Sequence, residues 1–446
     1  MKIRPDLTAE LRRTLALAGP MIVGQVGQML IGLTDSAMIG RLGTVPLAAA
    51  AFTHGVFGVF FIAGIGLLSP VGVYTARDHG AGDLAGCAAW LRHGRVLALG
   101  VSLGAFAVLA VLATQLRRFG QPEAVVAIAP PFFLLISASL VPTLLFQVQR
   151  QFAESLGHPL APMMIMLADV VLNALLNWMF IWGHLGAPAL GLTGSGVATL
   201  LARSLAVAVL AFWLRRSTDL APVRAAPRGA WDPARFHALR TMGLPAAGCL
   251  LFESGAFAMA ALMMGWLGAP ALAAHQIALS CAAFVFMVPL GLATALSLRL
   301  SKALGAGRPD LVPIIAAGAL LLSCGVMLVS ATVFALAGQA LARGFTADPG
   351  VIALAARLLA VAALFQLFDG GQVMGGAALR GLTDVKVPTV ITFAAYWLFA
   401  LPAGYLLAFH SPLGPTGVWA GLALGLATAA IALWVRFRRL VAGGLA

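Results

Sequence analysis

Long apolar segments recur along the whole chain and limit its possible folds more than any other feature. Twelve runs of roughly 20 or more residues contain few charges and are separated by short polar breaks. Only α-helices and closed β-barrels satisfy their backbone hydrogen bonds in a bilayer, and runs of this length match helices. We therefore predict an all-α polytopic membrane protein with twelve transmembrane helices. They cover residues 15–40, 47–75, 96–115, 124–149, 160–183, 190–214, 239–265, 271–298, 312–338, 351–376, 387–409 and 417–437.

The composition agrees with a membrane protein. Of the 446 residues, 61% are hydrophobic and only 10% are charged, and the 50 glycines allow helices to pack closely. The net charge of +13 does not indicate nucleic-acid binding, because the charges lie between the apolar segments. The four cysteines lack metal-ligand spacing and fall mostly in apolar runs, so we interpret them as packing residues.

The basic residues predict the orientation. If both termini and the loops after the even-numbered helices share one side, that side holds all but six of the 28 Lys and Arg residues. The loops of membrane proteins that face the cytoplasm carry an excess of Lys and Arg residues. We therefore expect a multi-pass membrane protein with both termini cytoplasmic. The six remaining residues are Arg41, Arg117, Arg118, Arg203, Arg343 and Arg357.

The two halves of the chain repeat each other. A shift of 225 residues places Pro20 on Pro245, and it superposes two Leu-Gly pairs and two Gly-Ala-Gly turns without a gap. The shift carries six helices onto six, so the halves share one orientation and are related by an axis along the membrane normal. We predict an N-terminal lobe at 1–215, a basic cytoplasmic linker at 216–237 and a C-terminal lobe at 238–446.

Four acids lie inside the predicted helices, where a charge is costly and is by default a candidate functional group. Asp35 shares a helix face with Gln28 at i−7, and Asp169, Asn173 and Asn177 share a face at intervals of four. The face formed by Asp169, Asn173 and Asn177 could hold a cation together with Asp35, or could hydrogen-bond to neighbouring helices. For Asp169 the structural interpretation is favoured.

The acids of the second half are placed differently. Glu253 falls on Gln28 in the repeat, and Asp369 precedes two glycines that allow a backbone or a ligand to approach. A buried carboxyl group can hold a proton, Na⁺ or an organic cation, and competition among these ligands is the physical basis of antiport. His54 and His275 are expected to be hydrogen-bonded within the helix bundle, and a proton relay is the alternative.

Several motifs together resemble the MATE (multidrug and toxic compound extrusion) transporters over essentially the whole chain. Glu253 combined with Asp369 is similar to the NorM-type branch. The other matching motifs are Pro20…Gln28…Asp35…Gly40-Arg41-Leu42-Gly43, Leu172-Asn173…Asn177, Ala273-Ala274-His275-Gln276-Ile277, Leu379-Arg380-Gly381 and Tyr396-Trp397…Leu401-Pro402.

The resemblance implies two pseudo-symmetric six-helix lobes around a central cavity, whose rocking exports organic cations against an inward flow of Na⁺ or H⁺. It implies a site for substrate or protons in the N-lobe and a coupling-cation site in the C-lobe, with Na⁺ at Glu253 and Asp369 as one possibility. The N-lobe residues are Asp35, Gln28, Asn173, Asn177 and Thr199, and the C-lobe residues are Glu253, Asp369 and Gln276.

Two residues depart from the family pattern. Some relatives carry an acid where this chain has Asn177, and some carry a tyrosine where it has Phe365. Both differences bear on the coupling ion, so the sequence leaves Na⁺ and H⁺ open.

The expected function is secondary active multidrug efflux by a monomer that needs no cofactor beyond the coupling ion. Its expected partners are small cationic or hydrophobic drugs and membrane lipids. One alternative is a flippase for lipid-linked precursors, although only Arg203 offers a mid-helix cation for an anionic lipid. The other is an intramembrane enzyme with paired acids, which a 225-residue repeat does not explain. We therefore expect no enzymatic activity.

Overall fold

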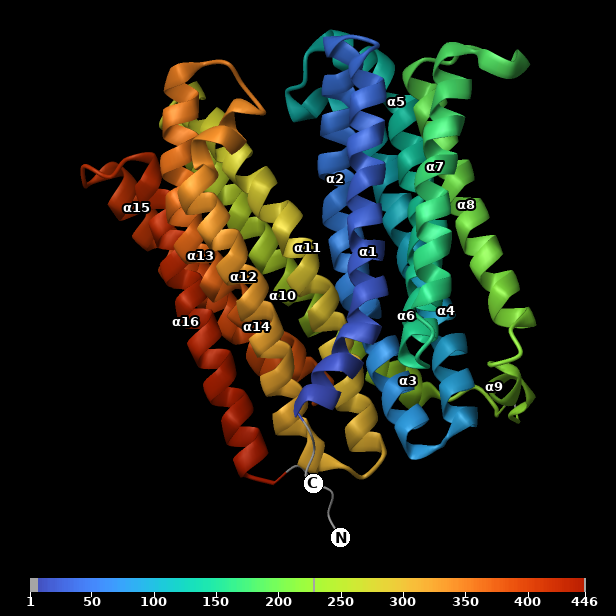
Figure 1. The fold of residues 1–446 in the computed structure, drawn as a ribbon. Helices are drawn as coiled ribbons and strands as arrows, with labels where there is room; N and C mark the ends of the chain where they lie inside the picture. The colour runs from blue at the N-terminus through green and yellow to red at the C-terminus, as the bar shows by residue number, and fades with distance from the viewer. Residues whose placement is uncertain (1–6, 228, 445–446) are drawn as a thin grey trace. The chain divides into compact units, whose positions relative to one another are not determined.

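The computed structural model describes residues 7–227 and 229–444, which form helices joined by short connections (Figure 1). No β-strand occurs in these residues. The helices are α1 (Leu7–Gly40), α2 (Thr44–Leu68), α3 (Pro70–Ala81), α4 (Leu84–Ala113), η1 (Leu116–Phe119), α5 (Glu123–Ala138), α6 (Leu140–Ser155), α7 (Leu160–Trp182), η2 (His184–Gly186), α8 (Leu192–Arg216), α9 (Ala221–Ala225), α10 (Pro233–Trp266), α11 (Ala269–Gly305), η3 (Pro309–Leu311), α12 (Val312–Arg343), α13 (Pro349–Gly381), α14 (Lys386–Phe393), the π-helical turn η4 (Ala394–Ala400), α15 (Leu401–Phe409) and α16 (Pro415–Ala442).

The prediction of twelve transmembrane helices is confirmed. Twelve helical segments of the described chain are long and apolar enough to cross a membrane, and each overlaps one predicted segment in order. Three of them contain an interruption: α2 and α3 form one segment, α5 and α6 another, and α14, η4 and α15 a third.

Prolines explain where these segments are interrupted, because a proline provides no N–H for the preceding turn. Pro70 follows the break at Ser69, whose hydroxyl donates to the Gly66 carbonyl at 2.8 Å. Pro402 is the second residue after the π-helical turn. Prolines do not always end a helix here, since Pro20 and Pro245 lie inside α1 and α10.

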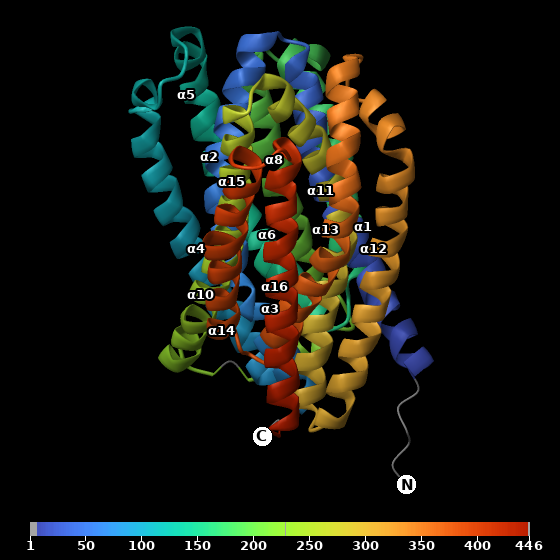
Figure 2. The same cartoon turned by 90° about the vertical axis from the view of Figure 1, so that its left-hand side faces the viewer.

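The chain divides into two compact units. The first, which we call the N-unit, comprises residues 23–247, and the second, the C-unit, comprises residues 248–444 together with 7–22. In the N-unit α7 packs on α8, α2 on α5, and α6 on both α4 and α8. In the C-unit α13 packs on α11, α12 and α16, and Figure 2 shows α14 and α15 running beside α16. The lobe and linker boundaries at 1–215, 216–237 and 238–446 remain a prediction from the sequence.

The internal repeat is visible in the backbone of corresponding glycines. Gly43 and Gly268 precede α2 and α11 with φ of 118° and 113°, and Gly191 and Gly414 precede α8 and α16 with φ of 55° and 52°. These conformations favour glycine because it lacks a Cβ atom. The same backbone turn therefore begins the corresponding helix in each half.

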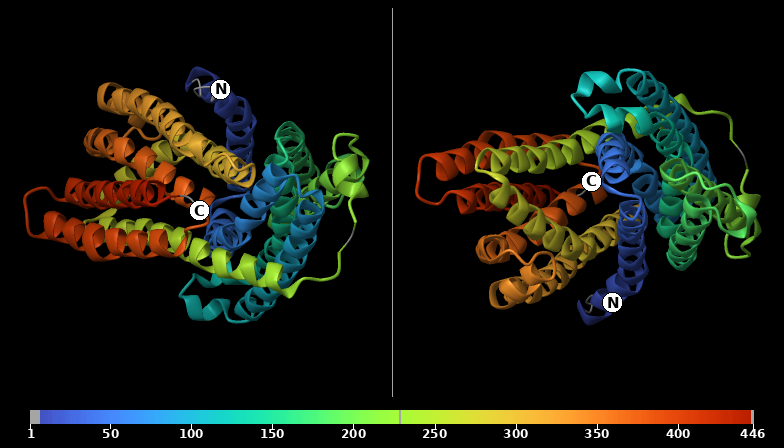
Figure 3. Two further views of the ribbon diagram at one scale, coloured as in Figure 1. Left: turned by 90° about the horizontal axis from the view of Figure 1, so that it is seen from below. Right: turned by 90° about the horizontal axis from the view of Figure 1, so that it is seen from above.

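The connection between α8 and α10 is held against the N-unit, along whose side it passes in Figure 3. The guanidinium of Arg92 donates to the carbonyls of Gly229 and Ala230 at 2.8 and 2.7 Å. The ring of His93 stacks on Trp231 with centroids 4.1 Å apart. This part of the linker is therefore ordered by side chains of α4.

Candidate functional site

Asp35 is at the centre of a buried hydrogen-bond network in the N-unit. The Asn177 amide donates to one carboxyl oxygen at 2.6 Å, and the Thr199 hydroxyl lies 3.4 Å from the other. Asn177 also donates to Asn173 at 3.1 Å. The four side chains are at most 1% exposed. The structure therefore assembles on α1, α7 and α8 four residues that the sequence predicted as one site.

The helix geometry explains this assembly. Asn173 and Asn177 are one turn apart on α7, and α7 packs side by side with α8, which carries Thr199 (Figure 1). Two amides and a hydroxyl provide the polar contacts that an acid needs inside an apolar bundle. Gln28, also predicted for this site, is half-buried two turns before Asp35 on α1, and none of the hydrogen bonds of the described residues joins it to the network.

In the C-unit, Glu253 on α10 and Asp369 on α13 lie close enough to interact electrostatically. Asp369 is 4% exposed and Glu253 is half-buried. Neither acid forms an ion pair with a basic residue within 4.0 Å in the part of the chain described, although Arg380 interacts with Glu253 over a longer distance. The predicted pair of acids is thus brought together without a neutralising contact.

Several polar groups on the helices that carry this pair, or beside it, make no hydrogen bond of standard geometry in the part of the chain described. The side chains of Tyr396 and Gln372 interact with the Glu253 carboxyl group. Within the described residues the Tyr396 hydroxyl, the Gln372 carbonyl oxygen and both amide atoms of Gln366 are buried but make no hydrogen bond of standard geometry. Unsatisfied buried polar atoms are rare and costly. They are therefore suited to receive a ligand or water.

Two further predictions for the C-unit concern Gln276 and the glycines that follow Asp369. Gln276 on α11 is exposed, and no hydrogen bond of the described chain joins its side chain to either acid. The glycines after Asp369 are used for packing: a Cβ atom on Gly370 would lie 2.8 Å from Met327, and the Gly371 carbonyl accepts from Trp434 at 2.8 Å.

The two histidines behave in different ways. His275 accepts a hydrogen bond from Trp419 at 3.1 Å, whereas its other ring nitrogen is buried without a partner. The Nε2 atom of His54 likewise has no partner among the described residues, and its ring contacts the edge of Phe132. His275 therefore forms the expected hydrogen bond with one of its two ring nitrogens. The contact of His54 is aromatic.

The site residues predicted from the sequence did not include three residues that the structure places beside these acids. Tyr396 and Gln372 approach Glu253, and Arg203 interacts electrostatically with Asp35 and Asp169. Tyr396 and Arg203 were visible in the sequence as a family motif and as a mid-helix cation. Their neighbours in space depend on contacts between helices far apart in the chain, so spacing alone did not reveal them.

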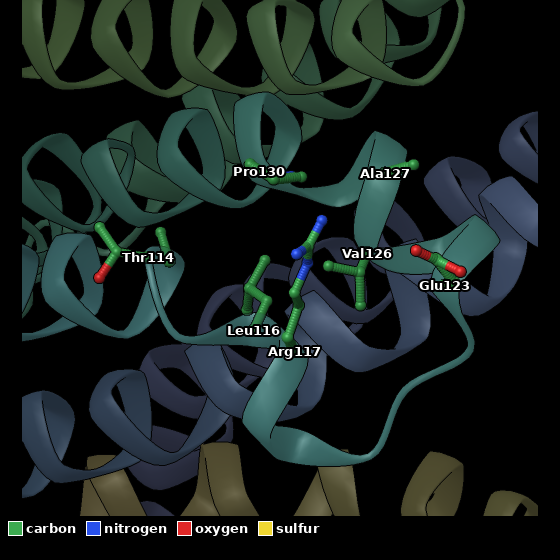
Figure 4. Close-up of a pocket in the computed structure, with 8 residues that line it drawn as sticks. Thr114, Leu116, Arg117, Glu123, Val126, Ala127 and Pro130 are labelled. Atoms are coloured by element: carbon green, nitrogen blue, oxygen red, sulfur yellow. The ribbon is translucent and has the colours of Figure 1, made fainter.

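A separate pocket of about 300 Å³ lies between the end of α4 and the start of α5 (Figure 4). Its charged lining residues are Arg117 and Glu123. None of the predicted site residues lines it. In the described residues no group of three or more His, Cys, Asp or Glu side chains is placed to hold a metal ion.

Twelve membrane-length helices, and acids within them in each of two units, define a polytopic helical membrane protein with internal ionisable sites. The solved structures confirm the fold: the chain matches the "Crystal structure of eukaryotic MATE transporter AtDTX14" with a TM-score of 0.87 and 21% identity, covering 98% of each chain. It matches the "Crystal structure of MATE in the straight conformation" with a TM-score of 0.89, covering 97% of this chain and 96% of the other.

The MatE family model matches residues 20–179 and 245–406, one segment in each half. The chain is 38% identical over 443 residues to the "Probable multidrug resistance protein NorM" of Bradyrhizobium diazoefficiens, covering 97% of this chain and 94% of that protein. It is 34% identical over 442 residues to the "Multidrug resistance protein PmpM" of Pseudomonas aeruginosa, covering 97% and 92%. The chain belongs to the MatE family.

Proposed function

We propose that the protein is a secondary active multidrug efflux transporter that exchanges drugs for Na⁺ or H⁺ by alternating access. Its proposed substrates are small organic cations and hydrophobic drugs, and the relatives that are named multidrug resistance proteins support a drug as the substrate. One observation carries the proposal. Asp35, Glu253 and Asp369 lie inside membrane-length helices beside amides and hydroxyls, and no basic side chain among the described residues pairs with them within 4.0 Å.

This arrangement supports exchange because a carboxylate in an apolar bundle is costly until a cation or a proton neutralises it. A salt bridge would do this permanently and would leave nothing to exchange. We assign Asp35, with Asn173, Asn177 and Thr199, to a proton or a cationic substrate. We assign Glu253 and Asp369, with Tyr396 and Gln372, to the coupling ion.

The repeat and the helix interruptions support alternating access. Transporters with repeated halves commonly move one half against the other, and their sites lie near interrupted helices. Here the break between α5 and α6 lies at Ser139, whose hydroxyl receives a hydrogen bond from Arg203 at 2.8 Å. Arg203 in turn interacts with Asp35, so the ionisable group and the interruption are adjacent.

We also propose that the protein works as a monomer in the bacterial inner membrane with both termini in the cytoplasm, as the distribution of its 28 Lys and Arg residues supports. In a cysteine-free background, a membrane-impermeant maleimide applied to intact cells should label Thr346→Cys but not Thr218→Cys. The opposite result would reverse the orientation.

The two alternatives receive less support. A flippase for anionic lipids would need several cations at its site, whereas Arg203 stands beside two acids. An aspartyl-type enzyme would need two acids in direct contact, and no hydrogen bond of the described residues joins Glu253 to Asp369.

The decisive experiment is transport in proteoliposomes driven by an imposed Na⁺ gradient or, separately, an imposed pH gradient. We expect one gradient to drive export of a fluorescent organic cation and so to identify the coupling ion. Asp35→Asn, Glu253→Gln and Asp369→Asn should each reduce the initial rate more than ten-fold at normal protein levels, because each removes a group on which cations exchange. Asp219→Asn, at a residue 66% exposed in the linker, is the matched control. Wild-type rates from all three variants would refute the assignment.

A further inference from the structure

A second polar layer lies one helical turn from the Asp35 network in the N-unit. Asp169 precedes Asn173 by one turn on α7, and Arg203 follows Thr199 by one turn on α8. Because α7 and α8 pack as an antiparallel pair, the two residues lie at the same level. This layer therefore places an acid and a base beside the network that holds Asp35.

Asp169 is available to a ligand. Its side chain is 5% exposed, and its Oδ1 atom makes no hydrogen bond to any described residue. A carboxyl oxygen buried without a donor is costly unless it receives a ligand, a proton or water. Asp35, in contrast, already accepts a hydrogen bond from Asn177 and lies 3.4 Å from the Thr199 hydroxyl. Asp169 thus has a capacity for binding that the network does not use.

Arg203 is fixed by contacts other than the acids. Its guanidinium donates to the Ser139 hydroxyl at 2.8 Å and lies 5.2 Å from the centre of the Phe57 ring. No ion pair within 4.0 Å joins it to an acid among the described residues, yet it interacts electrostatically with Asp35 and Asp169. Arg203 also interacts electrostatically with His54 on α2.

We propose that Asp169 is the second carboxylate of the cation site in the N-unit, and that Arg203 is a positioning residue. The positive charge of Arg203 cancels one of the two negative charges of the site. With both acids ionised and His54 neutral, the site carries one net negative charge and therefore takes a single monovalent organic cation. This inference rests on the proposed function and deepens it, because it names the charge class of the substrate.

The charge balance has a measurable consequence. Two unit charges a few ångströms apart at an effective dielectric constant of about 20 interact strongly enough to change a binding constant more than about ten-fold. Removal of Arg203 leaves two uncompensated acids, which favour a divalent cation. Removal of Asp169 leaves no net charge, which weakens the binding of any cation. Removal of both restores a single negative charge.

The test compares two matched probes, benzyltrimethylammonium and p-xylylenebis(trimethylammonium), which carry one and two quaternary ammonium groups. Isothermal titration calorimetry at pH 7.5 measures their binding to the purified full-length protein. We expect wild type to prefer the monovalent probe. Arg203→Gln should shift the ratio of the two Kd values at least ten-fold toward the divalent probe. Asp169→Asn should weaken monovalent binding at least ten-fold.

Three further variants separate charge from structure. Asp169→Asn combined with Arg203→Gln should return the ratio to within about three-fold of wild type, and Arg203→Lys, which keeps the charge, should preserve it. Arg215→Gln, near the end of the same helix, is the control. A ratio that stays constant in Arg203→Gln, or that the double variant does not restore, would overturn the proposal. Wild type that binds neither probe would refute the proposed substrate class itself, and this inference with it.

Discussion

At the scale of single residues, the structure shows that neutral polar groups accompany the buried acids. Amides and a hydroxyl contact Asp35, and an amide and a phenol approach Glu253. Such groups stabilise a carboxylate less permanently than a cation would, which leaves the acid able to change ligands. The phenol is that of Tyr396. It places a hydroxyl near the acids, although Phe365 has none where some relatives carry a tyrosine.

We predict that Tyr396→Phe weakens binding of the coupling ion without unfolding the protein. The hydroxyl is buried beside Glu253 and makes no hydrogen bond of standard geometry to a described residue, so its loss costs little stability. Its loss as an ion ligand should raise the half-saturating concentration of the driving ion by about three- to ten-fold, which corresponds to roughly 1 kcal/mol. Transport rates across a series of ion concentrations measure this. Tyr405→Phe, at a residue 43% exposed, is the control, and equal half-saturation in both variants would exclude the role.

At the scale of the elements, close helix packing in the C-unit depends on small residues. Gly421 on α16 faces the backbone of Gly404 on α15, and a Cβ atom built at Gly421 would lie 2.3 Å from the Gly404 nitrogen. Small residues allow this approach, which replaces the hydrophobic driving force that is missing between helices in lipid. The apolar composition therefore decides only that these helices enter the membrane, whereas glycine positions decide which faces meet.

We predict that Gly421→Ala lowers the stability of the purified protein in detergent by about 1–3 kcal/mol, because the new methyl group must push α15 away. Gly376→Ala on α13 is the matched control, since its Cβ atom would meet no atom within 4 Å. The control should be neutral or slightly stabilising, because alanine favours a helix. Thermal unfolding measures both variants. Equal melting temperatures for the two would contradict the packing argument.

At the scale of the whole molecule, each unit includes the start of a helix from the other half of the repeat. In the C-unit Gly291 on α11 contacts Ile22 of α1, and in the N-unit Gly66 on α2 contacts Ala247 of α10. The shift of 225 residues relates the two contacts. Ion pairs fasten both helix starts: Glu10 pairs with Arg299, and Arg235 pairs with Asp78 at 3.1 Å.

We predict strong coupling between Glu10 and Arg299. Their side chains are 5% and 13% exposed, so loss of Glu10 leaves Arg299 as a poorly solvated charge, whereas Glu10 keeps a second ion pair with Arg13 when Arg299 is removed. Glu10→Gln should therefore cost about 3 kcal/mol and Arg299→Gln less, and the double variant should cost less than their sum by about 1 kcal/mol or more. Chemical denaturation in detergent provides the four values of the cycle.

The exposed pair Arg308 and Asp310 is the control for this cycle, and its coupling should be much weaker because solvent screens both charges. Additive effects of Glu10→Gln and Arg299→Gln would show that the ion pair does not hold the start of α1.

The sequence by itself determined the membrane fold. Twelve apolar runs predict twelve spanning helices because backbone hydrogen bonds must be satisfied within each helix, a rule that needs no knowledge of neighbours. Spacing along one helix likewise predicted that Asn173 and Asn177 share a face. The family motifs then predicted that Asp35 and Thr199 join them.

Only the tertiary structure decided which groups from different helices meet. Tyr396 and Gln372 reach Glu253, Arg203 stands beside Asp169, and Gln276 remains exposed. Helix periodicity gives a direction for each side chain, but the rotation of one helix against another follows from close contacts at glycines such as Gly66 and Gly291. These contacts join residues far apart in the chain, and no local pattern encodes them.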